Sequence, residues 1–154
     1  MVSVVIRLKG TISTKPKIKR TLELLNLQRT HHAAVLPENP VSEGMLRVVK
    51  DYVTWGEVDA KLLADIIRKR GELTGHKPVT DEYIKNHSKY KSVDEFASAI
   101  SKGEAKYTDL PDIKPIIRLP PPKKGYRSLK RSFNDGGDLG YRGKEIATLI
   151  ERML

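Results

Sequence analysis

A basic stretch towards the C-terminal end carries the side-chain types that bind nucleic acid. Tyr126 stands there among the cations Lys123, Lys124, Arg127, Lys130 and Arg131. Lysine and arginine neutralise backbone phosphates, and a tyrosine ring can stack on an exposed base. The prolines at 120–122 precede this stretch and predict a stiff polyproline segment. We therefore expect a loop that is held away from the body of the protein and contacts RNA. The alternative is an ordinary solvated surface.

A second group of cations falls where helix stability alone would not place it. Pro16 can occupy the first position of a helix, and Ile18, Leu22 and Leu25 then repeat at helical spacing. The first turns of this helix carry Lys15, Lys17, Lys19 and Arg20. Cations at a helix N-terminus oppose the helix dipole, at a cost of about 0.3–1 kcal/mol each. A bound anion explains this group better than stability does.

The glycine-rich residues 136–145 resemble a nucleotide-binding P-loop only in composition. One residue too many separates Gly137 from Gly143, and Glu145 stands where a serine or threonine would bind magnesium. Two interpretations stay open for this stretch. It forms either a tight turn into the last helix, or a loop whose backbone approaches a phosphate or another backbone.

The remaining polar residues predict neither catalysis nor a metal site. His31 and His32 are adjacent at the start of a strand, where they point to opposite sides and cannot easily share one ion. Ser128 and Ser132 have no histidine near them in the sequence, and no nucleophile, base and orienting group can be assigned to one site. We therefore expect no enzyme activity, no cofactor and no small-molecule substrate.

The charge of the 154-residue chain is unevenly distributed. The formal net charge is +10, of which residues 1–56 carry +5, residues 57–113 carry −1 and residues 114–154 carry +6. Two basic ends predict a polyanionic partner, and a generally basic soluble protein is the alternative. The absence of cysteine excludes a disulfide scaffold and cysteine-ligated metals. We expect neither a membrane span nor a signal peptide.

The first 56 residues predict the element order β-α-β-α-β. Residues 2–8 alternate as a strand with one buried face does. The helix from Pro16, a strand at 33–36, a helix capped by Asn39 and a strand at 52–55 that ends at Gly56 follow in turn. This order favours an α+β fold with a two-layer core and both helices on one face of the sheet.

The rest of the chain predicts a mostly helical C-terminal extension. Asp59, Thr80 and Ser92 are candidate N-caps, and Glu95 should complete a capping box with Ser92. Residues 116–119 look like an edge or isolated strand because Pro115 precedes them. A last helix is expected from Ile146. We therefore divide the chain into a core at 1–56 and an extension at 57–154.

Several short segments carry a family resemblance. They are residues 19–27 (KRTLELLNL), 44–56 (GMLRVVKDYVTWG), 67–71 (IRKRG), 80–81 (TD), 118–125 (RLPPPKKG) and 136–142 (GGDLGYR). Together they resemble the large-subunit ribosomal protein thirty family, whose eukaryotic branch is numbered seven, over essentially the whole chain. The long basic N-terminal extension of that branch is absent, so the chain looks like the archaeal long form.

The resemblance implies a ferredoxin-like core with a three-stranded antiparallel sheet in the order 3-1-2. It implies a structural role in the large ribosomal subunit, in the cytoplasm, with contacts to large-subunit rRNA and with 5S rRNA nearby. The neutral residues 57–113 are the candidate surface for neighbouring ribosomal proteins. A non-ribosomal nucleic-acid-binding architectural protein and an RNA-processing enzyme are the competing interpretations.

The residues that we expect to contact RNA include both basic groups and five further positions. The set is Lys15, Lys17, Lys19, Arg20, Arg29, His32, Arg118, Lys123, Lys124, Tyr126, Arg127, Lys130, Arg131, Arg142 and Lys144. The resemblance supports the helix start and the loop after the prolines, because the basic segments of the family map onto them.

Overall fold

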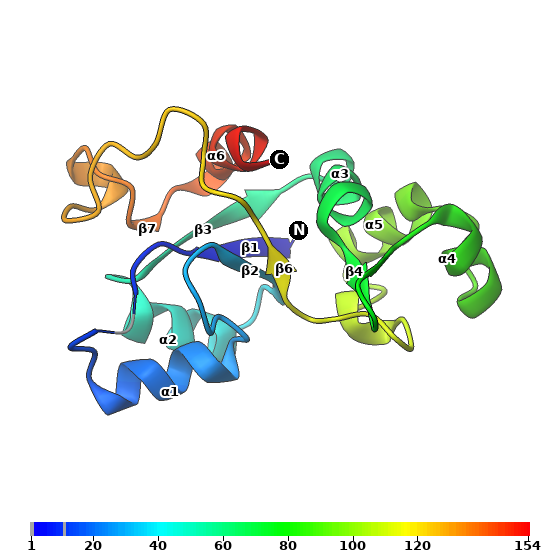
Figure 1. Cartoon of the computed structure of the whole chain (residues 1–154), viewed down its shortest axis with the longest axis horizontal. Coiled ribbons are helices and arrows are strands. Elements are labelled where there is room, and N and C mark those ends of the chain that lie inside the picture. Colours follow the sequence, from blue (N-terminus) through cyan, green and yellow to red (C-terminus); the bar gives the residue numbers. More distant parts are fainter. Residues whose placement is uncertain (1, 11) are drawn as a thin grey trace.

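Strand β1 (Val2–Arg7) lies at the centre of the sheet and is buried along its whole length. It pairs antiparallel with β2 (His32–Pro37) on one side and with β3 (Val53–Val58) on the other. This arrangement confirms the predicted order 3-1-2 of the core sheet. The computed structural model describes residues 2–10 and 12–154, and Figure 1 shows the arrangement of its elements.

Two short strands from the extension lengthen the sheet at both edges. β6 (Ile117–Arg118) pairs antiparallel with β2, as the expected edge strand, and β7 (Gly140–Tyr141) pairs parallel with β3. The described sheet therefore has the order β6-β2-β1-β3-β7. The prediction that β3 ends at Gly56 was wrong, because the strand continues to Val58. Gly56 instead allows the backbone at Gly143 to lie close to β3, since a Cβ at position 56 would lie 1.9 Å from the carbonyl oxygen of Gly143.

Helices α1 (Pro16–Leu24) and α2 (Pro40–Val49) cover one face of the sheet. Both begin with proline at the first position, as predicted, and the Asn39 side chain accepts a hydrogen bond of 2.7 Å from the Ser42 amide. Their apolar sides form one hydrophobic cluster with Val5, Ala34 and Val53 of the strands. The two helices and the sheet together form the two-layer core that the sequence predicts.

The opposite face of the sheet is covered as well, by the extension. Helix α6 (Ile146–Met153) lies across β3, and α3 (Ala60–Arg70) follows β3 directly (Figure 1). Val2, Val4 and Ile6 join their side chains in a second hydrophobic cluster. The prediction of one buried face for β1 was therefore wrong. The alternation is incomplete because Val5 is also apolar, and both faces meet helices.

The helical middle of the chain forms one end of the molecule. It contains α3, α4 (Asp81–His87) and α5 (Val93–Ser101), with a small hairpin of β4 (Glu72–Leu73) and β5 (Lys77–Pro78) that the sequence did not predict. Asp59, Thr80 and Ser92 cap their helices as expected. The Glu95 carboxylate accepts from the Lys91 amide, one residue before the amide that a capping box would use.

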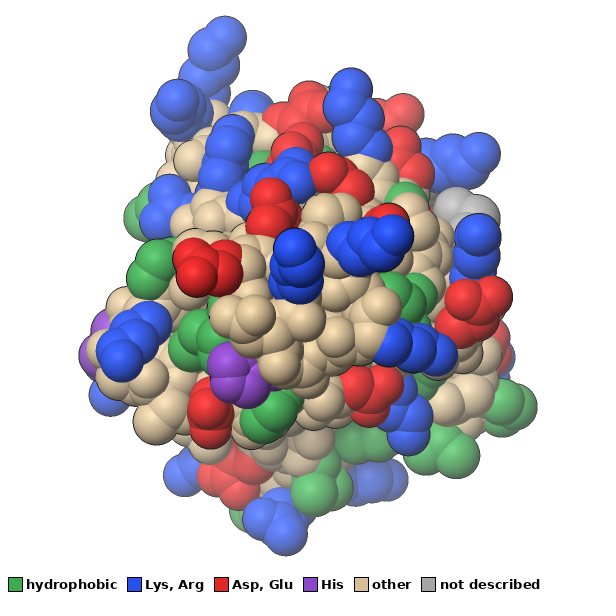
Figure 2. Space-filling view, turned by 90° about the vertical axis from the view of Figure 1, so that its right-hand side faces the viewer, with side chains coloured by type: hydrophobic (Ala, Val, Ile, Leu, Met, Phe, Trp, Pro, Cys, Tyr) green, Lys and Arg blue, Asp and Glu red, His purple; other side chains and the backbone are tan. Residues whose placement is uncertain are grey.

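Figure 2 views this end and shows Lys and Arg side chains interspersed with Asp and Glu. The mixture agrees with the near-neutral charge of residues 57–113. Within residues 2–10 and 12–154, no helix combines the length and the apolar character that crossing a membrane requires.

Short 3-10 helices complete the described elements. They are η1 (Tyr107–Asp109), η2 (Phe133–Asp135) and η3 (Gly143–Glu145). The larger hydrophobic cluster combines residues from both sides of position 56, from Val2 to Met153. The division into 1–56 and 57–154 stays a prediction. The two segments both contribute to this larger cluster.

Candidate nucleic-acid interface

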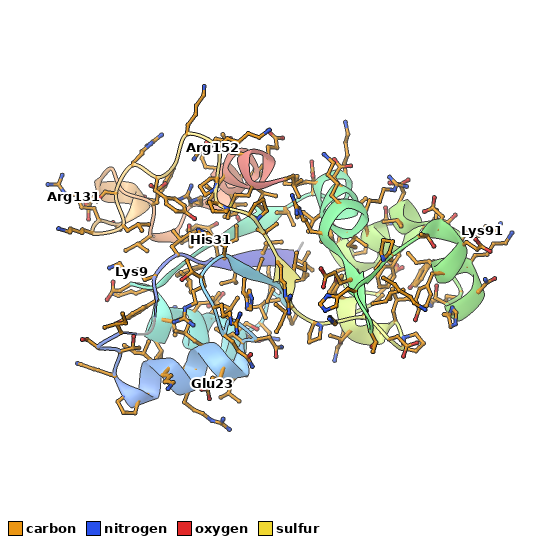
Figure 3. All side chains as sticks on the ribbon, in the orientation of Figure 1. Lys9, Glu23, His31, Lys91, Arg131 and Arg152 are labelled. Atoms are coloured by element: carbon orange, nitrogen blue, oxygen red, sulfur yellow. The ribbon has the colours of Figure 1, made fainter. Side chains whose placement is uncertain are left out.

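The two basic groups predicted from the sequence lie at one end of the molecule. The start of α1 and the loop after the prolines are found at the left of Figure 1, on opposite faces of the sheet, while α4 and α5 lie at the far end. Lys9 lies between them at the same end, and Arg131 points outward from the loop (Figure 3). The sequence analysis missed Lys9, which stands alone after β1.

The start of α1 has the electrostatics that the sequence predicts. Lys15 is the N-cap residue, its side chain makes no cap hydrogen bond, and the first turn has no acidic residue. Lys15, Lys17, Lys19 and Arg20 are all exposed. Arg20 contacts Glu23 at 3.5 Å, and both side chains are largely solvated, so this pair removes little of the positive potential.

Arg7 adds a buried cation below this surface. The side chain of Arg7 is only 1% exposed. Its Nε donates to the carbonyl of Lys9 and its Nη1 to that of Leu27, each at 2.8 Å, and Nη2 has no partner within the described part of the chain. Burial lowers the pKa of Arg7 from its ordinary value. The two carbonyls are neutral acceptors, and no ion pair between Arg7 and a carboxylate occurs among the described residues, so the guanidinium keeps its net charge.

Two hollows open above Arg7. One, of about 420 Å³, is lined by Arg7, Lys19, Arg20, Glu23, Leu24 and Gln28. The other, of about 200 Å³, is lined by Arg7, Gly10, Gln28, Arg29 and Thr30. Four cations therefore border neighbouring hollows against a single carboxylate, and such a surface attracts a phosphate group. Arg7 escaped the sequence analysis, although its signal was a cation on an otherwise apolar strand.

The loop at 123–131 is anchored to the body, so the expectation that it is held away was wrong. Arg152 of α6 donates from Nη1 to the carbonyls of Lys123 and Gly125, at 3.2 and 2.9 Å. The amides of Arg127 and Ser128 both donate to the Asp138 carboxylate. The cations of the loop, Lys123, Lys124, Arg127, Lys130 and Arg131, nevertheless remain exposed.

Tyr126 belongs to the packing rather than to the open surface. Its ring is half-buried and lies parallel to the His31 ring, with centroids 6.0 Å apart and planes at 10°. Its hydroxyl is buried without a partner within the described residues. Burial, followed by the charge of Asp138, raises the pKa of Tyr126 to about 12. One side of the ring is thus packed against His31, and the expected stacking of Tyr126 on a base stays a prediction.

Arg142 also has a structural position. It is 7% exposed, and its Nη2 donates to the Asp138 carbonyl at 2.7 Å and to the carboxylate at 3.0 Å, while Nε donates to Thr54 Oγ1 at 2.9 Å. The expected RNA contact through Arg142 stays a prediction, and these bonds give the side chain a structural role as well. Asp138 joins β3, the glycine-rich loop and the basic loop into one hydrogen-bonded unit.

The glycine-rich stretch packs backbone against backbone, which was one of the two interpretations left open. A Cβ at Gly137 would lie 2.0 Å from the carbonyl oxygen of Arg131. The Gly137 amide donates to the Ser132 carbonyl at 2.8 Å. Glycine is thus required because the two loop segments touch here.

The remaining predicted residues, His32, Arg29, Arg118 and Lys144, differ in exposure. His32 is buried, its Nδ1 accepts from the Arg29 amide at 3.3 Å, and its pKa is lowered by burial and then by the charges of Arg118, Arg29 and Arg7. The RNA contact expected of His32 stays a prediction. Arg118 lines a separate hollow with Lys69, Arg70 and His76. Arg29 and Lys144 are exposed.

No group of three or more His, Asp or Glu side chains that could hold a metal ion occurs within residues 2–10 and 12–154. The exposed polar side chains at the basic end are mostly cations, which bind anions through charge and hydrogen bonds. The arrangement therefore offers a wide cationic surface with two small hollows.

Comparisons with known proteins point to one family. The family described as Ribosomal protein L30p/L7e matches residues 4–53. The large ribosomal subunit protein uL30 of Methanobrevibacter smithii is 52% identical over 150 residues, which cover 97% of this chain and 98% of that protein. The proteins of that name from Methanocella arvoryzae and Archaeoglobus fulgidus are 48% and 46% identical over 149 residues, which cover 97% of each chain. By this full-length similarity, the chain belongs to the Ribosomal protein L30p/L7e family.

Proposed function

We propose that this chain is a structural constituent of the large ribosomal subunit and binds large-subunit rRNA in the cytoplasm. The observation that carries the proposal is the similarity of 46–52% to archaeal uL30 proteins over 97% of the chain. A ribosomal protein of this kind binds and shapes RNA and catalyses no reaction. Its net charge of +10 suits a polyanionic partner.

The RNA contact lies, in this proposal, at the basic end. Lys15, Lys17, Lys19, Arg20 and Arg29 approach phosphates on the α1 side, with Arg7 adding charge below them. Lys123, Lys124, Arg127, Lys130, Arg131 and Lys144 do so on the other side. Their accessibility supports this assignment, as does the lack of carboxylate partners for most of them among residues 2–10 and 12–154. Binding then gains from counterion release and shape fit more than from base readout.

Two further partners belong to the same proposal. 5S rRNA lies close to the bound protein, as the family resemblance implies. Neighbouring ribosomal proteins contact residues 57–113. The positive and negative charges of this segment are interspersed and nearly balanced, so it has no strong net charge to repel a protein partner (Figure 2). The position of the neutral end, which lies away from the basic surface (Figure 1), supports the protein contact.

Cosedimentation and salt-dependent binding test the proposal together. The protein should sediment with large ribosomal subunits through a moderate salt wash. If it neutralises roughly six phosphates, log K for an rRNA fragment should fall with log salt at a slope near −5. Replacing Lys15, Lys17, Lys19 and Arg20 by alanine should weaken binding and flatten that slope by about 3.

A variant with the same change in charge serves as the control. Lys85, Lys89, Lys91 and Lys102 are exposed cations in or near α4 and α5. Their replacement by alanine should leave the slope nearly unchanged. An unchanged slope for the α1 variant would remove α1 from the interface. Absence of the wild-type protein from the subunit peak would refute the ribosomal assignment.

A further inference from the structure

A hollow on the α2 side of the sheet differs in chemistry from the basic surface. It has a volume of about 400 Å³. Ser3, Leu36, Trp55, Glu57 and Tyr141 contribute its floor from four neighbouring strands, and Glu43, Leu46 and Arg47 of α2 contribute one wall. Glu38 and Asn39 border it at the turn between β2 and α2. The hollow exists because α2 leaves this end of the sheet uncovered.

The charge of this hollow is opposite to the charge of the chain. Glu38, Glu43 and Glu57 line it against Arg47 alone, in a protein of net charge +10. Arg47 lies 3.9 Å from Glu43 in an exposed pair, which leaves Glu38 and Glu57 without a cation among the described residues. Glu57 accepts a hydrogen bond of 2.6 Å from the Tyr141 hydroxyl. This bond, then burial and the charges of Glu57 and Glu38, raise the pKa of Tyr141.

Two aromatic rings lie beside the carboxylates. Trp55 and Tyr141 are adjacent in the parallel pairing of β3 with β7, with ring centroids 6.2 Å apart and planes at 47°. Tyr141 is 51% exposed. The face of an aromatic ring attracts a cation, and a guanidinium can also stack on it. Carboxylates and aromatic faces in one hollow therefore favour a flat or extended cationic group.

Ser3 adds a hydroxyl to the lining of the hollow. It is 8% exposed and lies on the central strand, whose backbone is paired with strands on both sides. Its side chain is thus what lines the hollow. No hydrogen bond of the Ser3 hydroxyl is found within the described residues, and its oxygen is not one of the fully buried atoms that lack a partner there. The hydroxyl is therefore open to the hollow, where a ligand donor can bind it.

We propose that this hollow binds an arginine or lysine side chain from a basic, extended segment of a neighbouring protein. Charge complementarity selects this occupant, since phosphates are repelled by Glu38, Glu43 and Glu57. A purely apolar segment would bury those carboxylates without a partner, at a high cost. The inference goes beyond rRNA binding, because it uses a separate hollow, the opposite charge and a protein partner.

Intrinsic fluorescence reads this hollow directly, because Trp55 is the sole tryptophan of the chain. The probe is a blocked hexapeptide of alternating arginine and glycine, titrated into the full-length protein. The Trp55 emission should change and saturate with the arginine peptide, while a matching glutamate peptide should have no effect. Replacing Glu38 and Glu57 by glutamine should weaken binding about tenfold, at roughly threefold for each lost charge.

A second double variant controls for the general loss of negative charge. Glu82 of α4 and Glu151 of α6 are exposed and lie outside the hollow, and Glu82→Gln with Glu151→Gln should leave the peptide affinity nearly unchanged. Equal weakening by both double variants would overturn the proposal. Circular dichroism checks that each variant is folded, and glutamine at 57 keeps an acceptor for Tyr141.

The same protein also tests two other occupants of the hollow, RNA and a second copy of the chain. If a short poly(U) RNA changes the Trp55 emission and displaces the peptide, RNA occupies the hollow and the proposal fails. If the protein dimerises in sedimentation velocity and Glu38→Gln/Glu57→Gln abolishes the dimer, the occupant is a second copy, which also overturns the proposal. The rRNA salt slope of this variant should match the wild type, so failure here leaves the rRNA proposal intact.

Discussion

The cations of this protein fall into two groups, those that are buried and hydrogen-bonded and those that are exposed to solvent. Arg7 and Arg142 are buried and donate hydrogen bonds to backbone carbonyls or to Asp138. Lys17 and Arg131 face solvent. Sequence spacing alone could not separate these groups, because burial depends on what packs above each strand. Asp138 shows the same point, since a single carboxylate orders two loops.

The buried histidine predicts how stability depends on pH. The pKa of His32 in the folded protein is lowered from 6.5, first by burial and then by Arg118, Arg29 and Arg7. The unfolded chain therefore takes up a proton near pH 6.5 when the folded protein does not. His32 alone should make the free energy of unfolding fall as pH drops below about 6.5, by at most about 1.4 kcal/mol per pH unit.

Urea unfolding at pH 7.5 and 5.5 measures this effect. His32→Asn should reduce the difference between the two pH values, although it costs some stability at both. His87→Gln is the control, because His87 lies at the surface on α4, far from His32, and this variant should keep the wild-type difference. His31 has a pKa lowered in the same direction by burial, so a residual slope in the His32 variant is expected. A wild-type difference of zero would contradict the prediction.

Helix α1 combines a well-packed apolar side with an N-terminus whose charges oppose the helix dipole. Its apolar side packs as the spacing of Ile18, Leu22 and Leu25 predicts, while its start has cations and no capping side chain. Helix α2 has the usual arrangement instead, with the Asn39 cap and Glu43 in the first turn. The difference between the two helices is best explained by an anion at α1.

A charge reversal separates the two effects. Lys17→Glu places an acidic residue at the second position of α1, so it should raise the free energy of unfolding by about 0.3–1 kcal/mol and weaken rRNA binding several-fold. Lys61 occupies the second position of α3 and is exposed. Lys61→Glu should stabilise the protein similarly and leave rRNA binding nearly unchanged. Urea unfolding and filter binding measure both quantities. Weaker binding by both variants alike would point to net charge rather than to α1.

The whole molecule depends on the extension to complete the sheet. β6 and β7 cover both edges, while α6 packs against β3. Gly56 is the point of closest approach, because its missing side chain leaves room for the Gly143 carbonyl. The basic loop, the glycine-rich turn and α6 are thereby fixed to the core.

A pair of glycine variants tests how tightly the C-terminal extension packs against β3. Gly56→Ala forces η3 and α6 away from β3, so it should lower the free energy of unfolding by about 1–3 kcal/mol. Gly44 lies within α2, where an added Cβ would have no neighbouring atom within 4 Å, so Gly44→Ala should raise stability by about 0.5–1 kcal/mol. Opposite shifts in denaturation midpoint are expected. A neutral Gly56→Ala would mean that the extension packs more loosely against β3 than the close contact at Gly143 requires.

Local signals were strong enough to predict most elements. Proline at 16 and 40, the caps at 39, 59, 80 and 92, and helical apolar spacing act through neighbours in the chain, so they are visible in the sequence. The two-residue strands β4, β5 and β7 were missed because they are too short to show a pattern and are defined by their partners. A similar limit explains Tyr126, whose place against His31 depends on how the loop folds back.

The sequence by itself determined the β-α-β-α-β order, the uneven charge and the family resemblance, because these depend on residue type and short spacing. Only the tertiary structure decided which cations are exposed, how the basic loop is anchored, and that both faces and both edges of the sheet are covered. Burial and long-range hydrogen bonds arise between segments far apart in the chain. Asp138 and Arg142 are the clearest examples. Their residue types gave no sign in the sequence that they connect β3 to the two loops through hydrogen bonds.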